Sequence, residues 1–490
     1  MEEEKETPSS NSSRREFLKN SALTAAGFMI VPRHVLGGKG FLAPSDRLTV
    51  AAIGTGGKGA DDIAHFFRTG KVDIGFLCDV DTRSAANSVK KFPKAKYYKD
   101  WREMLDKESK SIDAVSVSIP DHNHAVATVA AMQLGKHVYT QKPLTHDIYE
   151  ARTLAEAAKR YKVVTQMGNQ GGSGDGVRQL MEWYDADVIG KVHTVYCWTN
   201  RPVWPQGIPW PTDKPPVPPE LDWNLWIGTA QYRDYINKLV PFNWRGWWDF
   251  GTGALGDMGC HIVDPAFRVL DLKYAKDVQA SVGSVYVDEF QRGYFPQSCP
   301  PSSHVILTFP KTDKTDQDVT VHWMDGGIQP ERPEELLPNE VFGDGGNGTL
   351  FIGTKGKMMC ATYGADPKLL PTTRTSEVNV PKTIPRVPGS AEGHYGQWVD
   401  ACIAGYGKNY LSSPFEFAGP LTEALLMANL AIRGFDIRTP RASGNGYDYP
   451  GRYLKLLWDN TNMKVTNFDL ANQYVKREYP KGFELNFKTM

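Results

Sequence analysis

A glycine-rich turn near the start of the chain has the residue types and the setting to bind a dinucleotide. The apolar run 48–53 is typical of a buried parallel strand, and a helix is predicted from Ala60 to Phe67. Glycines between such elements let backbone N–H groups approach a pyrophosphate and let the helix pack closely on the sheet. The intervening residues are therefore candidate cofactor-binding residues: Gly54, Thr55, Gly56, Gly57, Lys58 and Gly59.

An acidic residue follows the next predicted strand. The strand Val72–Cys78 ends at Asp79, whose carboxylate is placed to bind the ribose hydroxyls of adenosine. Arg83 nearby is suited to a 2′-phosphate. The pattern favours NAD and leaves NADP open.

Further along the chain, a histidine and two carboxylates share a helical spacing. Asp257, His261 and Asp264 stand at i, i+4 and i+7 on one face if a helix begins near Ala254. Pro265 would kink that helix; alternatively, Asp264 caps a second helix with Pro265 in its first position. In both arrangements Asp257 and His261 stay close. A histidine, with an unperturbed pKa of about 6.5, is a natural proton acceptor near neutral pH.

The elements around the glycine-rich turn alternate between strand and helix. Strands are predicted over 113–119, 137–140 and 163–167, and helices over 125–134 and 145–161. This alternation predicts an α/β fold with a doubly wound parallel sheet, which binds ligands at the carboxyl ends of its strands. The candidate residues at those ends are Pro120, Asn123, His124, Gln141, Lys142, Asn169 and Gln170. His122 and His124 lack partners at metal-site spacing, so no metal is expected.

A second α/β domain is predicted after residue 168. Its strands are expected at 191–199, 278–287, 304–309, 318–324 and 349–353, and its helices at 394–404 and 420–434. Eight of the 13 tryptophans fall between Trp198 and Trp248, which suits stacking on sugar rings and equally suits plain packing. The candidate substrate contacts in this region are Asn243, Arg245 and Trp248. We predict an NAD(P)-binding domain over 46–168 and a substrate-binding and oligomerisation domain, with a C-terminal extension, over 169–490.

The first 45 residues have the pattern of a twin-arginine export signal and a linker. Arg14 and Arg15 lie within Ser-Arg-Arg-Glu-Phe-Leu-Lys and precede the apolar stretch Ala22–Val31. We therefore expect the twin-arginine export machinery as a partner and a periplasmic location. No cysteine follows the apolar stretch, so no lipid anchor to a membrane is expected. Lys and Arg number 56, as do Asp and Glu, which argues against nucleic-acid binding.

Several motifs in order resemble the Gfo/Idh/MocA family of glucose–fructose oxidoreductase and inositol dehydrogenase. Beyond the glycine-rich turn they are Ile119-Pro120 with His124, Gly135-Lys136-His137-Val138, Gln141-Lys142-Pro143-Leu144, and the segments 221–228 and 251–264. The resemblance runs from about residue 46 to the C-terminus. It implies a Rossmann domain followed by an α/β domain with an open, mainly antiparallel sheet, covered by helices on one face and forming homo-oligomer contacts on the other.

The resemblance also implies that Lys142, Asp257 and His261 line the site where hydride leaves a sugar-like alcohol. Lys142 would hydrogen-bond the alkoxide, His261 would accept the proton, and Asp257 would hold His261 or bind a sugar hydroxyl. Two positions depart from the family pattern. Gln141 stands where Glu is usual, which removes a carboxylate beside Lys142, and Gly171-Gly172 stands where relatives often carry an arginine.

The predicted function is an exported NAD(P)-dependent oxidoreductase acting on a carbohydrate or polyol. Because no recycled nicotinamide pool exists beyond the inner membrane, we expect a tightly bound cofactor. One alternative is an NAD-dependent glycosidase that acts on a glycoside by transient C3 oxidation and elimination; the Lys142-Pro143 pair favours the dehydrogenase, because glycosidase relatives lack it. A second alternative is a non-catalytic sugar-binding protein, against which the intact Lys142, Asp257 and His261 argue.

Overall fold

The computed structural model describes residues 47–487, and the predicted export signal lies outside these residues. The first sheet has six parallel strands in the order β3-β2-β1-β4-β5-β6. They are β1 (Leu48–Ile53), β2 (Val72–Cys78), β3 (Lys96–Tyr98), β4 (Ala114–Val117), β5 (His137–Thr140) and β6 (Thr165–Met167). All four residues of β4 are buried, as expected for a strand covered on both faces. This sheet confirms the predicted doubly wound fold.

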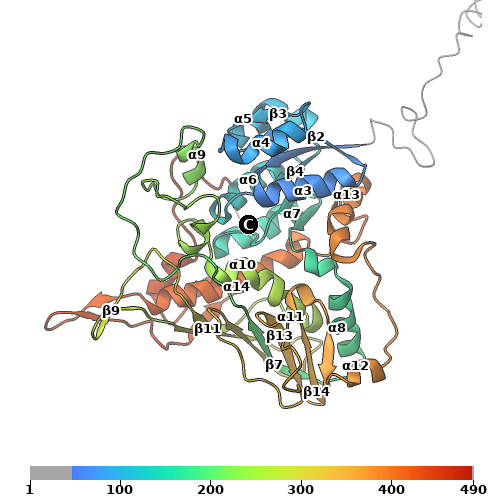
Figure 1. Cartoon of the computed structure of the whole chain (residues 1–490), viewed down its shortest axis with the longest axis vertical. Coiled ribbons are helices and arrows are strands. Elements are labelled where there is room, and N and C mark those ends of the chain that lie inside the picture. The colour runs from blue at the N-terminus through green and yellow to red at the C-terminus, as the bar shows by residue number, and fades with distance from the viewer. Residues whose placement is uncertain (1–46, 488–490) are drawn as a thin grey trace, which may run out of the picture. The chain divides into compact units, whose positions relative to one another are not determined.

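Helices flank this sheet, in the blue and cyan part of Figure 1. They are α3 (Gly57–Arg68), α4 (Thr82–Lys91), α5 (Trp101–Glu108), α6 (His124–Gln133) and α7 (Ile148–Tyr161). The segment α4-β3-α5 had no predicted counterpart. Only two residues of α4 are buried and β3 has three residues, so this segment carries little hydrophobic periodicity.

The second sheet has nine strands in the order β15-β14-β13-β7-β12-β11-β8-β18-β19. Only β7 and β12 run parallel, so the sheet is mixed and mostly antiparallel. Its strands are β7 (Val192–Trp198), β8 (Asp277–Val282), β11 (Ser303–Phe309), β12 (Val319–Met324), β13 (Gly348–Gly353), β14 (Gly356–Cys360), β15 (Lys368–Leu370), β18 (Leu456–Asp459) and β19 (Lys464–Val465). Strict burial of alternate residues in β11 indicates one covered face.

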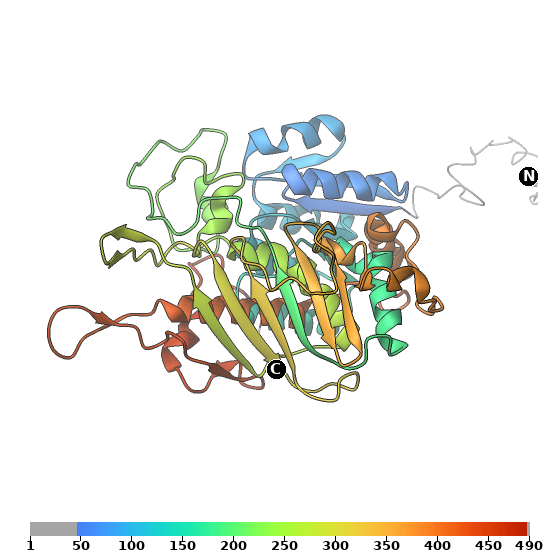
Figure 2. The ribbon, with the colours of Figure 1, turned by 60° about the horizontal axis from the view of Figure 1, so that its bottom comes forward.

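Helices of the second domain cover that face, and in Figure 2 the sheet lies in front of α14. The helices of this part of the chain are α8 (Asp175–Asp185), α10 (Gly253–Ile262), α11 (Asp264–Leu270), α12 (Arg374–Glu377), α13 (His394–Ala404) and α14 (Phe415–Phe435). Of these, α14 packs on β8 and β11, and α11 packs on β13. The break between α10 and α11 answers the question raised by Pro265, which lies in the first turn of α11. Asp264 is the first residue of α11 and does not cap it, because its carboxylate accepts hydrogen bonds from Asn169 and from Arg268.

Two expectations for the second domain were wrong in detail. The strand expected over 278–287 ends at Val282, and β9 (Tyr286–Asp288) then forms a separate hairpin with β10 (Gln291–Arg292). At the break, a Cβ on Gly283 would lie 2.2 Å from Ser302 Oγ. A second small hairpin joins β16 (Thr439–Pro440) and β17 (Tyr447–Asp448). Helix α14 also starts earlier than predicted.

Parts of the C-terminal half return to the first domain. Tyr395 and Trp398 of α13 pack in one buried cluster with Phe66 of α3 and strands β1 and β2. The expected boundary at residue 168 therefore separates the two sheets but not all of their helices. No helix in the part of the chain that the structure describes is both long and apolar enough to cross a bilayer.

Candidate active site

The glycine-rich turn forms one wall of a cavity of about 500 Å³. Gly54 has φ +83°, and a Cβ on it would lie 2.2 Å from the carbonyl oxygen of Ser118. A Cβ on Gly59 would lie 2.1 Å from the Gly54 oxygen, so glycine lets α3 approach β1 closely. Among the described residues, no side chain caps the first turn of α3. Its N–H groups, beside the lining residues Gly54, Gly56 and Gly57, fit an anionic pyrophosphate.

Asp79 lies at the end of β2 and lines the same cavity. Its Oδ2 accepts hydrogen bonds from the backbone N and Oγ1 of Thr55, at 2.9 and 3.3 Å, and its Oδ1 accepts one from Asp81 N at 3.0 Å. These bonds hold the carboxylate at the edge of the groove. Arg83 pairs with Asp81 at 2.6 Å.

The opposite wall comes from residues 199–252, which we call the cover segment. It contains α9 (Trp223–Ile227) and a 3₁₀ turn at Asn243–Gly246. The backbone of Leu221 forms an isolated antiparallel β-bridge with Asp81, and Thr229 N donates to Asn123 Oδ1 at 2.9 Å. Leu221, Leu225 and Trp226 line the cavity. The cover segment therefore lies across the carboxyl edge of the parallel sheet, where ligands of this fold bind.

Lys142 follows β5 and reaches Asp257 in the first half of α10. Its Nζ donates to the backbone oxygen of Asp257 at 2.7 Å and to Oδ1 at 2.9 Å. Arg245 Nε lies 3.3 Å from the same Oδ1. Burial alone would raise the pKa of Asp257, but the charges of Lys142 and Arg245 outweigh it and hold the pKa at about 2. Asp257 therefore stays ionised and holds the Lys142 ammonium in the cavity wall.

His261 lies one turn further along α10 and also lines the cavity. Its Nδ1 is 3.1 Å from Asn169 Oδ1, and Asn169 Nδ2 donates to Asp264 Oδ1 at 2.8 Å. Arg268 in turn pairs with Asp264 at 2.7 Å. Since Asn169 uses its amide nitrogen on Asp264, its oxygen must accept from His261, which places the proton on Nδ1 and leaves Nε2 as an acceptor.

Burial, followed by the nearby charge of Lys142, lowers the pKa of His261 well below its usual value. The imidazole is therefore neutral near pH 7. The contacts of Asp257 and Asn169 differ from two of the expectations. Asp257 does not hold His261 by a hydrogen bond, because it pairs with Lys142 and Arg245. Asn169, expected to contact substrate, is fully buried and positions His261 instead.

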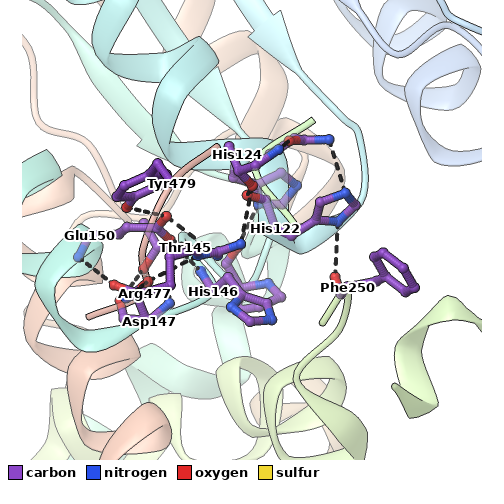
Figure 3. A network of polar contacts seen from close by, with 12 residues as sticks. His122, His124, Thr145, His146, Asp147, Glu150, Phe250, Arg477 and Tyr479 are labelled. Atoms are coloured by element: carbon purple, nitrogen blue, oxygen red, sulfur yellow. Dashed lines mark hydrogen bonds and ion pairs between the residues drawn. The ribbon is translucent and has the colours of Figure 1, made fainter. Parts of the chain in front are cut away.

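The other predicted residues divide by whether they reach the cavity. Those that line it, besides the ones described above, are Lys58, Pro120, Asn123, Gln141, Gln170 and Arg245. Those that do not are Thr55, Gly59, His124, Asn243 and Trp248. His124 is buried, with Nδ1 2.8 Å from Pro143 O and Nε2 2.6 Å from Ile119 O (Figure 3). Trp248 packs over Arg433 in the core, away from this cavity.

The two departures from the family pattern have structural explanations. Gln141 Nε2 donates at 2.8 Å to the buried Asp62, which also pairs with Lys58 at 2.9 Å. A glutamate at position 141 would place two carboxylates against each other there. Cβ atoms on Gly171 and Gly172 would lie 2.8 Å from Tyr363 and 2.3 Å from Arg268 Nη2. Arg268 therefore occupies the space beside this turn.

Tyr363 is a lining residue that the sequence analysis missed. Its ring meets His261 edge to face, with ring centroids 4.5 Å apart. It belongs to a turn after β14, nearly two hundred residues away from Gly171, and only the pair of glycines hinted at a bulky neighbour. Phe242 and Trp244 also line the cavity and stack on Arg245, at 4.6 and 4.3 Å from the ring centroids.

Comparison with known proteins gives partial matches along the sequence. The chain is 28% identical over 170 residues to a glycosyl hydrolase family 109 protein of Shewanella pealeana, covering 30% of this chain and 37% of that one. It is 24% identical over 191 residues to levoglucosan dehydrogenase of Pseudarthrobacter phenanthrenivorans, covering 39% and 40%. These alignments span about two fifths of the length of the curated relatives.

The fold comparison extends over most of the chain. The solved structure of levoglucosan dehydrogenase in complex with NADH and levoglucosan matches with a TM-score of 0.53 and 16% identity. The match covers 79% of this chain and 98% of that one. At this identity the likeness establishes the shared fold.

Two family models match the chain in succession. The model of the NAD-binding Rossmann domain of the oxidoreductase family matches residues 48–169, and the model of its C-terminal α/β domain matches residues 181–293. These matches coincide with the parallel sheet and with the start of the mixed sheet. Residues 48–169 and 181–293 are thus similar to the two domains of the Gfo/Idh/MocA oxidoreductase family.

Proposed function

We propose that the protein oxidises a secondary alcohol of a carbohydrate or polyol with a bound nicotinamide dinucleotide. The observation that carries the proposal is that one cavity is lined by the glycine-rich turn, by Lys142 and by His261, whose Nδ1 is bound to Asn169 and whose Nε2 is left as an acceptor. When bound, the nicotinamide would supply the acceptor for the two electrons of the alcohol. The chain must then provide a proton acceptor and an electrostatic partner for the oxygen.

His261 and Lys142 supply these two groups. The substrate hydroxyl gives its proton to Nε2 of His261, which is neutral and oriented through Nδ1 by Asn169. Lys142 donates a hydrogen bond to the oxygen as negative charge develops on it. Asp257 holds Lys142 in place and, because it stays ionised, keeps the ammonium from leaving the wall.

We propose that NAD is preferred over NADP. Asp79 lines the cavity beside Asp81, and a 2′-phosphate would meet these two carboxylates. Arg83 is already paired with Asp81. Lys99 also lines the cavity, and its charge would attract the 2′-phosphate of NADP. If NAD is the cofactor, replacing this lysine in Lys99→Met should leave NAD affinity unchanged.

The cover segment supports retention of the cofactor between turnovers. Besides its contacts with Asp81 and Asn123, the cover segment is bound by Arg477, whose Nη1 donates to Thr229 Oγ1 at 3.1 Å. Thr229 Oγ1 in turn donates to the backbone oxygen of His122. Release of a bound dinucleotide would require these contacts to open.

Mass spectrometry tests the proposal at its first step. Protein purified without added cofactor is denatured, and the released small molecules are weighed; NAD is expected. Gly56→Asp should abolish this cofactor, because a Cβ at this position would lie 1.8 Å from Ser84 Oγ and the added side chain would displace the glycine-rich turn. Protein that neither carries nor takes up NAD or NADP would contradict the proposal.

The partial similarity to glycosyl hydrolase family 109 proteins supports a second candidate, a glycosidase that oxidises C3 transiently. Incubation with a panel of glycosides separates the two. An oxidised sugar with the glycosidic bond intact supports the dehydrogenase, and a released aglycone supports the glycosidase. Binding without either product supports a non-catalytic sugar-binding protein.

We also propose that the protein is exported in folded form by the twin-arginine route, on the strength of Arg14, Arg15 and the apolar stretch after them. Replacing Arg14 and Arg15 together with lysine should retain the protein in the cytoplasm. Fractionation of cells that express the double variant measures this. Normal export of the variant would contradict the proposal.

A further inference from the structure

Three cationic side chains line the part of the cavity where the proposed substrate lies. Lys142 and Arg245 share one carboxylate, Asp257, at 2.9 and 3.3 Å. Arg201 is the third. Among the residues that the structure describes, no carboxylate lies within ion-pair distance of Arg201, and its side chain donates to the neutral Asn200 Oδ1 at 2.5 Å.

Arg201 belongs to the same side of the cavity as Arg245. It follows β7, and the nearby Trp204 ring meets the Phe242 ring with centroids 5.7 Å apart. Phe242 in turn stacks on Arg245, and Val203 and Phe242 both line the cavity. Arg201 therefore stands beside the wall that carries Asp257, on the second-domain side, whereas Asp79 and Asp81 come from the Rossmann domain.

The charges on this side do not balance. Lys142, Arg245 and Arg201 face one ionised carboxylate, Asp257, which leaves an excess of two positive charges. Asp121 also lines the cavity, but burial raises its pKa, and it accepts a hydrogen bond from Thr252 Oγ1 at 2.6 Å. Even with Asp121 ionised, one positive charge remains in excess. A wall of this kind favours an anionic ligand.

We propose that the substrate is a sugar acid and that Arg201 binds its carboxylate. The planar guanidinium presents paired N–H donors that match a carboxylate. Nη1 donates to Asn200, and no carboxylate of the described residues neutralises the group. The ring of the sugar would then lie between Arg201 and the pair Lys142 and His261, with Phe242, Trp244 and Tyr363 as apolar neighbours. This inference rests on the proposed oxidation chemistry.

The test uses matched pairs of substrates and the full chain with its bound cofactor. Each pair consists of a glycuronoside and the neutral hexoside of the same ring stereochemistry and anomer, which differ only by carboxylate against hydroxymethyl. Reduction of bound nicotinamide is followed by its absorbance. We expect kcat/KM to be at least about tenfold higher for the acid, the usual effect of a charge-assisted hydrogen bond.

Arg201→Met should remove that preference by raising KM for the acid, which lowers kcat/KM for that substrate. The value of kcat/KM for the neutral sugar should stay the same. Arg201→Lys should restore part of the preference. Arg441→Met, which removes an exposed arginine paired with Asp448, is the matched control and should change neither substrate.

Equal turnover of acid and neutral sugars, or a preference that survives Arg201→Met, would overturn this inference and leave the proposed oxidation standing. A sugar phosphate that reacts better than the glycuronoside would also overturn it, since the anion would then be a phosphate. If no sugar or polyol reduces the cofactor, the proposed function itself fails.

Discussion

Two clusters of paired charges, one lining the cavity and one outside it, each join an arginine to an aspartate. In the cavity, Lys142 and Arg245 converge on Asp257. Outside it, Arg477 pairs with Asp147 at 3.1 Å and with Glu150 at 3.4 Å, and Tyr479 donates to Glu150 at 2.8 Å (Figure 3). Only the first cluster lines the cavity.

The difference lies in how fully each cluster satisfies its own groups. Arg477 uses Nε, Nη1 and Nη2 on Asp147, Thr229 and Glu150, and it does not line the cavity. His261, beside the first cluster, keeps one ring nitrogen as an acceptor. A cluster whose polar groups are paired with one another stabilises a fold. A cluster that faces a cavity and keeps an acceptor beside it can act on a ligand. The predictions below test this division.

The largest effect is expected for Arg477→Met. It leaves the buried carboxylates of Asp147 and Glu150 unpaired, which should lower the free energy of unfolding by about 3–5 kcal/mol. Chemical denaturation measures this, with Arg441→Met as an exposed control that should change little. Arg477→Lys should recover part of the loss. Wild-type stability in Arg477→Met would show that the second cluster is not structural.

The next largest effect is on the rate of cofactor reduction, with no expected change in stability. His261→Ala and Lys142→Ala should each retain bound cofactor but slow its reduction in a single turnover by about 100-fold or more. Because both residues act on the same oxygen and proton, the double variant should be little slower than the slower single variant. Unchanged rates in both single variants would remove these residues from the mechanism.

The two clusters should also respond to pH in opposite directions. The pKa of Asp257 is lowered from 3.8 to about 2, so its contribution to stability is present above pH 3.8 and is lost as the pH falls through 2. Burial raises the pKa of Glu150 above 4.5 in spite of Arg477, so its contribution is present below pH 4.5 and is lost as the pH rises through the raised value.

Unfolding free energies measured across this pH range, for wild type, Asp257→Asn and Glu150→Gln, check both signs. The difference between wild type and Asp257→Asn should change only in acid. The difference between wild type and Glu150→Gln should change only above pH 4.5. The same pH dependence in both differences would mean that the two clusters do not differ as described.

The smallest effect is expected for Tyr479→Phe. It removes one hydrogen bond to Glu150 Oε1 and should lower the free energy of unfolding by about 1 kcal/mol. The single-turnover rate should stay at the wild-type value, because Tyr479 does not line the cavity. A slower rate at unchanged stability would contradict the division between the clusters.

The sequence predicted what depends on local pattern. The strand, glycine-rich turn and helix at 48–68 follow from apolar periodicity and glycine chemistry, and the approach of Asp257 to His261 follows from helical spacing. Lys142 came from the family resemblance. The roles of single residues within the site were harder to predict. Asn169 was expected to touch substrate, but it orients His261, from which it is separated by 92 residues in the sequence.

Contacts across long stretches of chain were not predictable. Arg477 reaches Asp147 over 330 residues, and Tyr363 reaches His261 from a turn whose only sequence signal was the glycine pair at 171–172. Both depend on how separate elements pack, which neither propensity nor spacing encodes. The sequence analysis placed candidate substrate contacts in the cover segment but did not predict its position over Asp81 and Asn123, which is set by tertiary contacts.

The most direct test of the central claim follows one hydrogen atom. The purified protein, with its nicotinamide oxidised, is mixed with sugars that carry deuterium on the ring carbinol carbons, and the released nicotinamide is weighed after one turnover. The proposed oxidation predicts that the nicotinamide gains one deuterium in wild type, and far more slowly in His261→Ala. A nicotinamide that gains no deuterium from any of these sugars would contradict it.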